Sequence, residues 1–167
     1  DCSSRGLGDV YKRQDKWFIS TNCNLCNEKN IEGINSIWKK LGSKTITMKS
    51  KDHDSIMAIT SHIPHLIAFN IVGTASDLEE DIKSEVIKFS ASGFRDFTRI
   101  AASDPVMWRD IMLSNKDEII SLFEKFNNDL KQILDAIKKD DGEFLVKKFK
   151  KTREIREKII EAGLDKN

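Results

Sequence analysis

Residues 114–140 read SNKDEIISLFEKFNNDLKQILDAIKKD and set the class of the fold. Apolar side chains recur there every three or four residues over about five helical turns; they are Ile119, Leu122, Phe123, Phe126, Leu130, Ile133, Leu134 and Ile137. This period is typical of one apolar face of a long amphipathic helix. We therefore expect this segment to be one of the long helices of an all-helical domain.

Start and stop signals extend the helical pattern on both sides of this segment. Ser114 with Asp117 resembles a capping box, and Asp140-Asp141-Gly142 ends the helix. A final basic helix follows, with the apolar residues Leu145, Phe149, Ile155 and Ile159. Upstream, Asp104-Pro105 predicts an N-cap and a first-turn proline for a short helix that extends to Met112.

The region after Asp52 is also helical by its apolar period. A long helix has an apolar face made of Ile56, Ile59, Ile63, Leu66, Ile67 and Phe69. Pro64 lies inside this helix and removes one backbone hydrogen bond, so we expect a kink there. Two more helices are predicted over about 78–89 and 94–102, with a loop over 90–93 in which Gly93 is available for a positive φ.

The N-terminal third has a different pattern. Residues 16–21, KWFIST, and residues 45–48, TITM, predict two strands, and the period over 31–41 predicts a helix between them. Such a unit has the size of one parallel crossover. Residues 1–51 carry a net charge of +5 and residues 52–167 one of −4, so the charge changes where the pattern does. Two strands alone are marginal in water, so this unit should be the tail of a larger sheet or pack against the helices, and we favour the larger sheet.

Residues 1–15 have no apolar period of either kind, and the first residue is Asp. We interpret these residues as an unrelated leader, disordered or artefactual. They contain Gly6-Leu7-Gly8, but no strand precedes it and no third glycine follows at residue 11, so it predicts no phosphate-binding turn.

Composition excludes several classes of protein. Of 167 residues, 39% are apolar and 33% are charged, which excludes a disordered or collagen-like chain. Lys and Arg number 28 against 27 Asp and Glu, so no basic field favours nucleic acid. Uninterrupted apolar runs reach only four residues, and we expect no membrane-spanning helix. Three cysteines cannot all pair and no secretory leader opens the chain, so we expect a reducing, cytoplasmic location.

Histidine and tryptophan side chains form the first candidate site. His62 and His65 lie three residues apart on one helix face beside Pro64, where imidazole could donate to a carboxylate. Trp108 lies in the first turn of its helix, where the helix end favours anions and the indole could cover a ring. The alternatives are a pair of interhelical histidines with satisfied hydrogen bonds and a tryptophan packed in the core.

Arginine side chains form the second candidate site. Arg99 lies four residues after Arg95 and three after Asp96. An arginine that is held by an aspartate could bind an anionic ligand, because its guanidinium matches a planar carboxylate. The alternative is an ordinary surface ion pair.

Cysteines offer a third possibility. Cys23-x-x-Cys26 and His62-x-x-His65 together could be written as four zinc ligands, but a single CxxC in a polar stretch is a weak signal. A redox-active CxxC would need the rest of a thioredoxin fold, which the sequence lacks. We therefore expect no metal site.

Three motifs resemble one known family in order and spacing. They are His53-Asp54 leading into residues 61–66 (SHIPHL), then residues 93–101 (GFRDFTRIA), then residues 103–111 (SDPVMWRDI). On these motifs the chain resembles the prephenate dehydrogenases, a family that includes the arogenate and cyclohexadienyl dehydrogenases, from about Lys16 to Ile137. The resemblance implies an N-terminal dinucleotide-binding domain, a C-terminal helical domain that forms the dimer, and an active site in the cleft between them.

The resemblance also implies a fold and a function for each part. Residues 16–51 would be a strand–helix–strand remnant of a Rossmann-type nucleotide-binding domain, and residues 52–167 a helical substrate-binding and dimerisation domain. The whole enzyme would catalyse the oxidative decarboxylation of prephenate, or of arogenate, with NAD or NADP in tyrosine biosynthesis. Its implied partners are a second copy of the chain and this substrate, without nucleic acid or membrane.

Substrate-side positions follow from the same resemblance, and they are Arg99, His62, His65, Trp108, Asp96 and Gly93. The arginine matches the family's carboxylate-binding arginine, and the two histidines match its substrate-side histidines. Trp108 and Asp96 match residues near the cleft or its gating ionic network. Gly93 stands in Ala91-Ser92-Gly93, where the family usually has a glycine cluster.

Two family features have no match in the sequence. There is no strand-linked GxGxxG, and the family's catalytic histidine has no counterpart. We therefore expect this chain to supply substrate contacts and the dimer interface, to contain no catalytic or cofactor-binding residue, and to be inactive alone. The alternative is a non-catalytic helical interaction module, with the apolar stripe of residues 119–137 as its partner-binding face.

Overall fold

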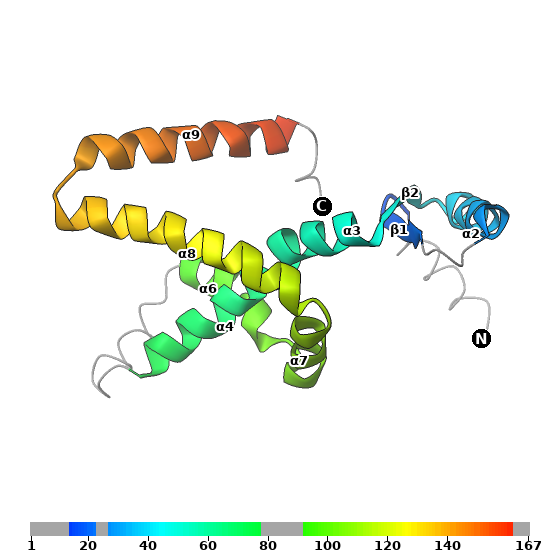
Figure 1. Cartoon of the computed structure of the whole chain (residues 1–167), viewed down its shortest axis with the longest axis horizontal. Coiled ribbons are helices and arrows are strands. Elements are labelled where there is room, and N and C mark those ends of the chain that lie inside the picture. The colour runs from blue at the N-terminus through cyan, green and yellow to red at the C-terminus, as the bar shows by residue number, and fades with distance from the viewer. Residues whose placement is uncertain (1–13, 23–26, 78–91, 162–167) are drawn as a thin grey trace. The chain divides into compact units, whose positions relative to one another are not determined.

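The computed structural model describes residues 14–22, 27–77 and 92–161 (Figure 1). These residues form two compact units that divide after Ile119. The predicted helix over 78–89, Cys23 and Cys26, and nearly all of the leader lie outside the described residues.

The first unit begins with a parallel strand–helix–strand crossover of β1 (Trp17–Asn22), α2 (Glu28–Lys40) and β2 (Lys44–Lys49). The two strands pair in parallel from Trp17 opposite Lys44 to Asn22 opposite Lys49. After α2 the chain turns into β2 through Gly42, whose φ of 87° suits a residue without a Cβ. The predicted crossover is confirmed.

Side chains alternate between the two faces of this small sheet. On one face Phe18 stacks on Trp38 of α2 with ring centroids 4.7 Å apart. Beside this pair, Asn35 of α2 donates from Nδ2 to the Thr47 hydroxyl over 3.0 Å. Trp17, on the alternate position of β1, is 57% exposed. Helix α2 therefore covers one face of the strands and leaves apolar surface on the other.

A long helix follows in three consecutive segments, α3 (Ser50–Met57), the π-helical turn η1 (Ala58–His62) and α4 (Ile63–Ser76). Just before Pro64, where we expect a kink, the helical pitch changes. Ile63 N–H donates to the carbonyl of Ala58, five residues back. Pro64 thereby falls in the first turn of α4, where its missing N–H is tolerated.

This helix, Ser50–Ser76, is the one helix in the described part of the chain that is long and apolar enough to cross a membrane. Its residues 55–76 contain no Asp, Glu, Lys or Arg. The sequence expectation rested on uninterrupted apolar runs, and it missed this helix because Ser, Thr, His, Asn and Gly interrupt the runs without adding charge. Ala58, Ile63 and Ala68 are buried residues of this helix.

Three helical segments complete the first unit: α6 (Ser92–Thr98), the 3₁₀-helix η2 (Arg99–Ala102) and α7 (Pro105–Ser114). Both α6 and η2 pack against α4. Asp104 caps α7 as predicted, because its Oδ1 accepts from the N–H groups of Val106 and Met107, each over 2.8 Å. Helix α8 (Lys116–Lys138) begins in this unit and continues into the second one.

Two local predictions in this region are wrong. Gly93 lies within α6 rather than in a loop, and it does not have a positive φ. The capping box at Ser114 does not form, because the Ser114 hydroxyl donates back to the Ile111 carbonyl over 2.9 Å, inside α7. Instead, the carbonyl of Asn115 accepts from the Ile119 N–H over 3.1 Å, at the start of α8.

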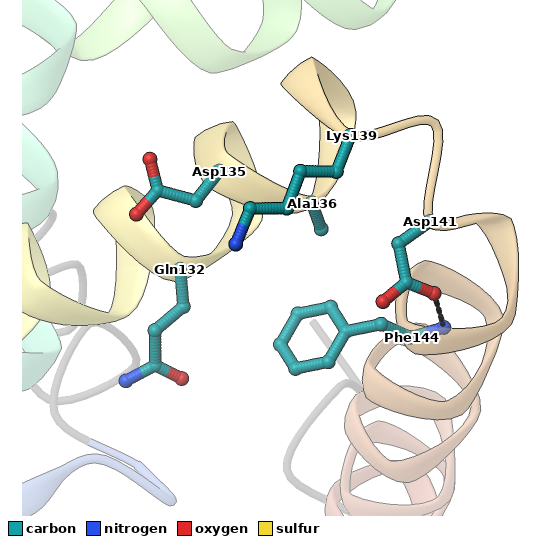
Figure 2. A pocket seen from close by; sticks show the side chains of 6 residues that line it. All are labelled: Gln132, Asp135, Ala136, Lys139, Asp141 and Phe144. Atoms are coloured by element: carbon teal, nitrogen blue, oxygen red, sulfur yellow. Dashed lines mark hydrogen bonds between the residues drawn. The ribbon is translucent and has the colours of Figure 1, made fainter.

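The second unit is an antiparallel hairpin of the rest of α8 and α9 (Gly142–Glu161) (Figure 1). Asp140 has a φ of 51°, and the N–H groups of Asp140 and Asp141 donate to the carbonyls of Ile137 and Ala136. This pattern is a Schellman cap, which ends α8 where the sequence predicts. An open cavity of about 230 Å³ lies at this elbow. Figure 2 shows the residues that line it, Gln132, Asp135, Ala136, Lys139, Asp141 and Phe144.

Candidate functional site

His65 and Trp108 stack face to face, although 43 positions separate them in the sequence. Their ring centroids lie 3.7 Å apart and their planes differ by 23°. His65 Nδ1 lies 2.8 Å from the carbonyl oxygen of Ser61. A carbonyl oxygen can only accept, so Nδ1 carries the proton and Nε2 is the acceptor of the neutral ring.

His62 meets the same indole edge-on. The centroids of His62 and Trp108 are 6.2 Å apart, with an interplanar angle of 76°. Burial lowers the pKa of His62, and repulsion from His53 and His65 lowers it further, while the Asp54 carboxylate partly opposes this change. At neutral pH the ring is therefore uncharged.

Polar contacts fasten this part of the long helix to the start of α8. Asn115 Nδ2 lies 2.8 Å from the Asp54 carbonyl oxygen and 3.2 Å from His62 Nδ1. One helical turn further, the Ser55 hydroxyl donates to Glu118 Oε2 over 2.7 Å. Sequence reasoning missed Asn115 and Glu118, because no spacing signal connects either residue to a segment about 60 residues away.

His53 is the third histidine near this cluster. Its Nδ1 lies 3.0 Å from Asp54 Oδ1, and both side chains are partly exposed. The sequence signal for these two residues was present, since His53-Asp54 opens the first of the three motifs, but neither was among the predicted site residues.

The indole nitrogen of Trp108 is a buried donor that has no acceptor among the described residues. Trp108 is 7% exposed, and its Nε1 has no hydrogen-bond partner in the described part of the chain. Leaving a buried donor unpaired costs about 1–3 kcal/mol, so such groups call for an explanation. The alternative of a tryptophan packed in the core therefore explains the burial of the Trp108 ring. It does not explain the unpaired indole N–H.

The predicted arginine site is arranged differently from the expectation. Arg99 begins η2, is exposed, and lies in a segment that packs against α4, the helix that carries His65. Within residues 92–161, neither Arg99 nor Asp96 forms an ion pair, so Asp96 does not hold this arginine in place. The helix tightens from α to 3₁₀ between Thr98 and Arg99, so the two residues lie in different helical segments.

Metal ligation was an alternative for the two histidines. Over the described ranges, no group of three or more His, Cys, Asp or Glu side chains could hold a metal ion. Since Cys23 and Cys26 lie outside these ranges, the four-ligand zinc alternative stays untested.

The fold and this cluster together define a helical domain that continues directly from a parallel α/β unit. Residues 49–151 match the family described as "Prephenate dehydrogenase, dimerization domain". The chain therefore belongs to the prephenate dehydrogenase family, and the predicted resemblance and mainly helical fold class are confirmed.

Curated relatives extend beyond this chain. It is 37% identical over 126 residues to the cyclohexadienyl dehydrogenase of Zymomonas mobilis, covering 75% of this chain and 43% of that protein. It is 31% identical over 144 residues to the prephenate dehydrogenase of Bacillus subtilis, covering 86% of this chain and 38% of that protein. The chain thus spans less than half the length of these relatives.

Solved structures show the same similarity. Prephenate dehydrogenase from Aquifex aeolicus, in complex with hydroxyphenyl propionate and NAD+, superimposes with a TM-score of 0.81 at 32% identity, over 87% of this chain and 51% of that one. Arogenate dehydrogenase from Synechocystis superimposes with a TM-score of 0.77 over 85% of this chain and 51% of that one, and at 20% identity it supports the fold alone.

Proposed function

We propose that this chain is part of a cytoplasmic dehydrogenase of tyrosine biosynthesis that oxidises prephenate or arogenate with NAD or NADP. In this proposal residues 16–51 end the nucleotide-binding domain and residues 52–167 form the helical domain that binds substrate and makes the homodimer. Residues 1–15 belong to neither domain. The observation that carries the proposal is the cluster of His62, His65 and Trp108 with its unpaired indole N–H.

The chemistry of the cluster suits an anionic ring. Prephenate carries two carboxylates on and beside a six-membered ring, so it needs a cation, hydrogen-bond donors and an apolar wall. Arg99 would supply the cation, through a guanidinium fork that matches a carboxylate. His62 would supply a neutral N–H donor, and Trp108 a second donor beside an apolar surface. Asp96 and Gly93 would border the substrate site on α6.

The residues at hand do not fit a dinucleotide. A pyrophosphate is usually held by a glycine-rich turn between a strand and a helix. Here the chain between β1 and α2 reads NCNLCN over residues 22–27 and contains no glycine. We assign hydride transfer to residues that lie outside this chain.

The proposal is tested by fusing an intact nucleotide-binding domain of the family ahead of residue 16 and following prephenate-dependent reduction of NAD or NADP. The fusion should be active, and Arg99→Ala should lower kcat/KM roughly 10- to 100-fold, because hydrogen bonds to charged groups contribute about 1.5–3 kcal/mol. Arg153→Ala is the matched control, since Arg153 is an exposed arginine of α9 that pairs with Glu157.

An inactive fusion, or equal activity of the two arginine variants, would contradict this function. Calorimetry with prephenate separates the alternative, because a helical interaction module has no reason to bind this dianion. A wild-type chain that binds prephenate more tightly than Arg99→Ala supports the dehydrogenase.

A further inference from the structure

Asn115 lies at the junction of α7 and α8 and contacts two groups of the long helix. Its Nδ2 is 2.8 Å from the carbonyl oxygen of Asp54 and 3.2 Å from Nδ1 of His62. The proposed substrate site makes no use of this side chain, and no periodicity of the sequence singles it out.

Hydrogen-bond chemistry fixes the orientation of the Asn115 amide. The Asp54 carbonyl can only accept, so the NH₂ group of Asn115 must face it. The same NH₂ group lies against His62 Nδ1, and this nitrogen must therefore accept. A ring nitrogen that accepts carries no proton, and the proton of the neutral imidazole stands on Nε2.

We infer that Asn115 is a positioning residue: its amide holds His62 in the tautomer protonated at Nε2, so that an uncharged ring offers an N–H to the substrate's carboxylate. This inference deepens the proposed function and rests on it for the identity of the ligand. The tautomer itself is a property of the chain without ligand.

His65 is held in the opposite tautomer by a different partner. Its Nδ1–H donates to the Ser61 carbonyl, so its Nε2 is left as an acceptor. The two imidazoles that meet Trp108 thus offer one donor and one acceptor. A substrate with both a carboxylate and a hydroxyl needs both kinds of group.

Charged groups around His62 act together with this arrangement. His53 and His65 disfavour a positive charge on His62, and Asp54 favours one. Glu118, at the start of α8, is bound to the Ser55 hydroxyl. Burial and the two other imidazoles keep the His62 ring neutral, which is the state in which Nδ1 can accept from Asn115.

The test is the protonation state of each ring nitrogen, measured by long-range ¹H–¹⁵N correlation NMR on the ligand-free, ¹⁵N-histidine-labelled chain. In the wild type above the imidazole pKa, we expect His62 Nδ1 and His65 Nε2 to have the chemical shift of an unprotonated nitrogen. The two histidines thus serve as opposite internal references. His62→Gln assigns the His62 signals.

Asn115→Asp replaces the donor with a carboxylate that can only accept. The His62 proton should move to Nδ1, and the pKa of His62 should rise because a negative charge favours the imidazolium. Asn128→Asp, the same change at an exposed position of α8, should alter neither. In the active fusion, Asn115→Asp should raise the KM for prephenate roughly ten-fold, the equivalent of one hydrogen bond to a charged group.

Failure of the inference and failure of the proposed function give different results. A wild-type His62 protonated at Nδ1 overturns the inference without any variant, and so does an Asn115→Asp chain whose His62 tautomer is unchanged. An inactive wild-type fusion overturns the proposed function whatever the tautomer.

Discussion

His62 shows how the surroundings of a single ring decide its chemistry. Burial and two neighbouring imidazoles oppose protonation of His62. The Asn115 amide also contacts Nδ1, the ring nitrogen that would take up the second proton. The sequence predicts His62, His65 and Trp108 as site residues because helical spacing and family motifs mark them. It does not predict Asn115, because this contact depends on how the α7–α8 junction packs against α3.

Stability should depend on pH through His62. Since its folded-state pKa lies below the ordinary value of 6.5, the unfolded chain binds more protons between the two values. The free energy of unfolding should therefore fall as the pH is lowered through 6.5 towards the folded-state pKa. Above this window both states are neutral at His62 and the effect is absent.

Urea unfolding at about pH 7.5 and about pH 5.5, on either side of the ordinary imidazole pKa, measures this effect. His62→Gln removes the titrating group and should lose less stability between the two conditions than the wild type. If both lose the same amount, His62 is not perturbed in the folded chain.

At the scale of helices and strands, periodicity and end signals predicted where the elements lie. They did not predict the hydrogen bonding at the ends of the helices. The strands, α2, the long helix, α7, α8 and α9 all lie where their patterns indicate. The wrong details are the capping box at Ser114 and the loop at Gly93. Both depend on local hydrogen bonds that several conformations of the same residues could make, so spacing alone does not choose between them.

The N-cap of α7 should be a measurable contribution to stability. Asp104→Ala removes the acceptor for two backbone N–H groups and should lower the free energy of unfolding by about 1 kcal/mol, as N-cap removal usually does. Asp104→Asn keeps an acceptor and should retain most of this contribution.

Asp110→Ala is the control on the same helix, because Asp110 forms an exposed ion pair with Arg109. Exposed pairs of this kind contribute little. Equal losses for Asp104→Ala and Asp110→Ala in chemical denaturation would mean that the cap is not formed in solution.

At the scale of the whole molecule, the described residues bury few large side chains for their number. Ile59 of the long helix is 50% exposed, and Phe149 of α9 is 55% exposed. Apolar surface on this scale is typical of a chain that binds another. The helical class was predictable from composition and period. The division of the chain after Ile119 was not predictable from the sequence, because the sequence pattern changes near residue 51 instead. In the structure α3 follows β2 directly and packs on both strands, so residues on the two sides of position 51 lie in one unit. The assignment of domains to residues 16–51 and 52–167 stays a prediction.

A dimer is the expected assembly, since the chain belongs to a family whose matching region is a dimerization domain. Sedimentation equilibrium should give about twice the chain mass of 19.1 kDa at micromolar concentrations. Phe149→Glu, within the matched region, should weaken self-association if α9 takes part in the interface. A wild-type chain that sediments at its monomer mass would contradict the dimer.

The π turn at Ala58–His62 explains how a proline is accommodated in the middle of a 27-residue rod. A proline ring inside an ordinary helix collides with the carbonyl four residues earlier. The additional residue in the π turn before Pro64 displaces that carbonyl, so the helix continues past the proline. Deleting a single residue from this turn would convert it to an ordinary α-helical turn, and His62 would no longer face Asn115.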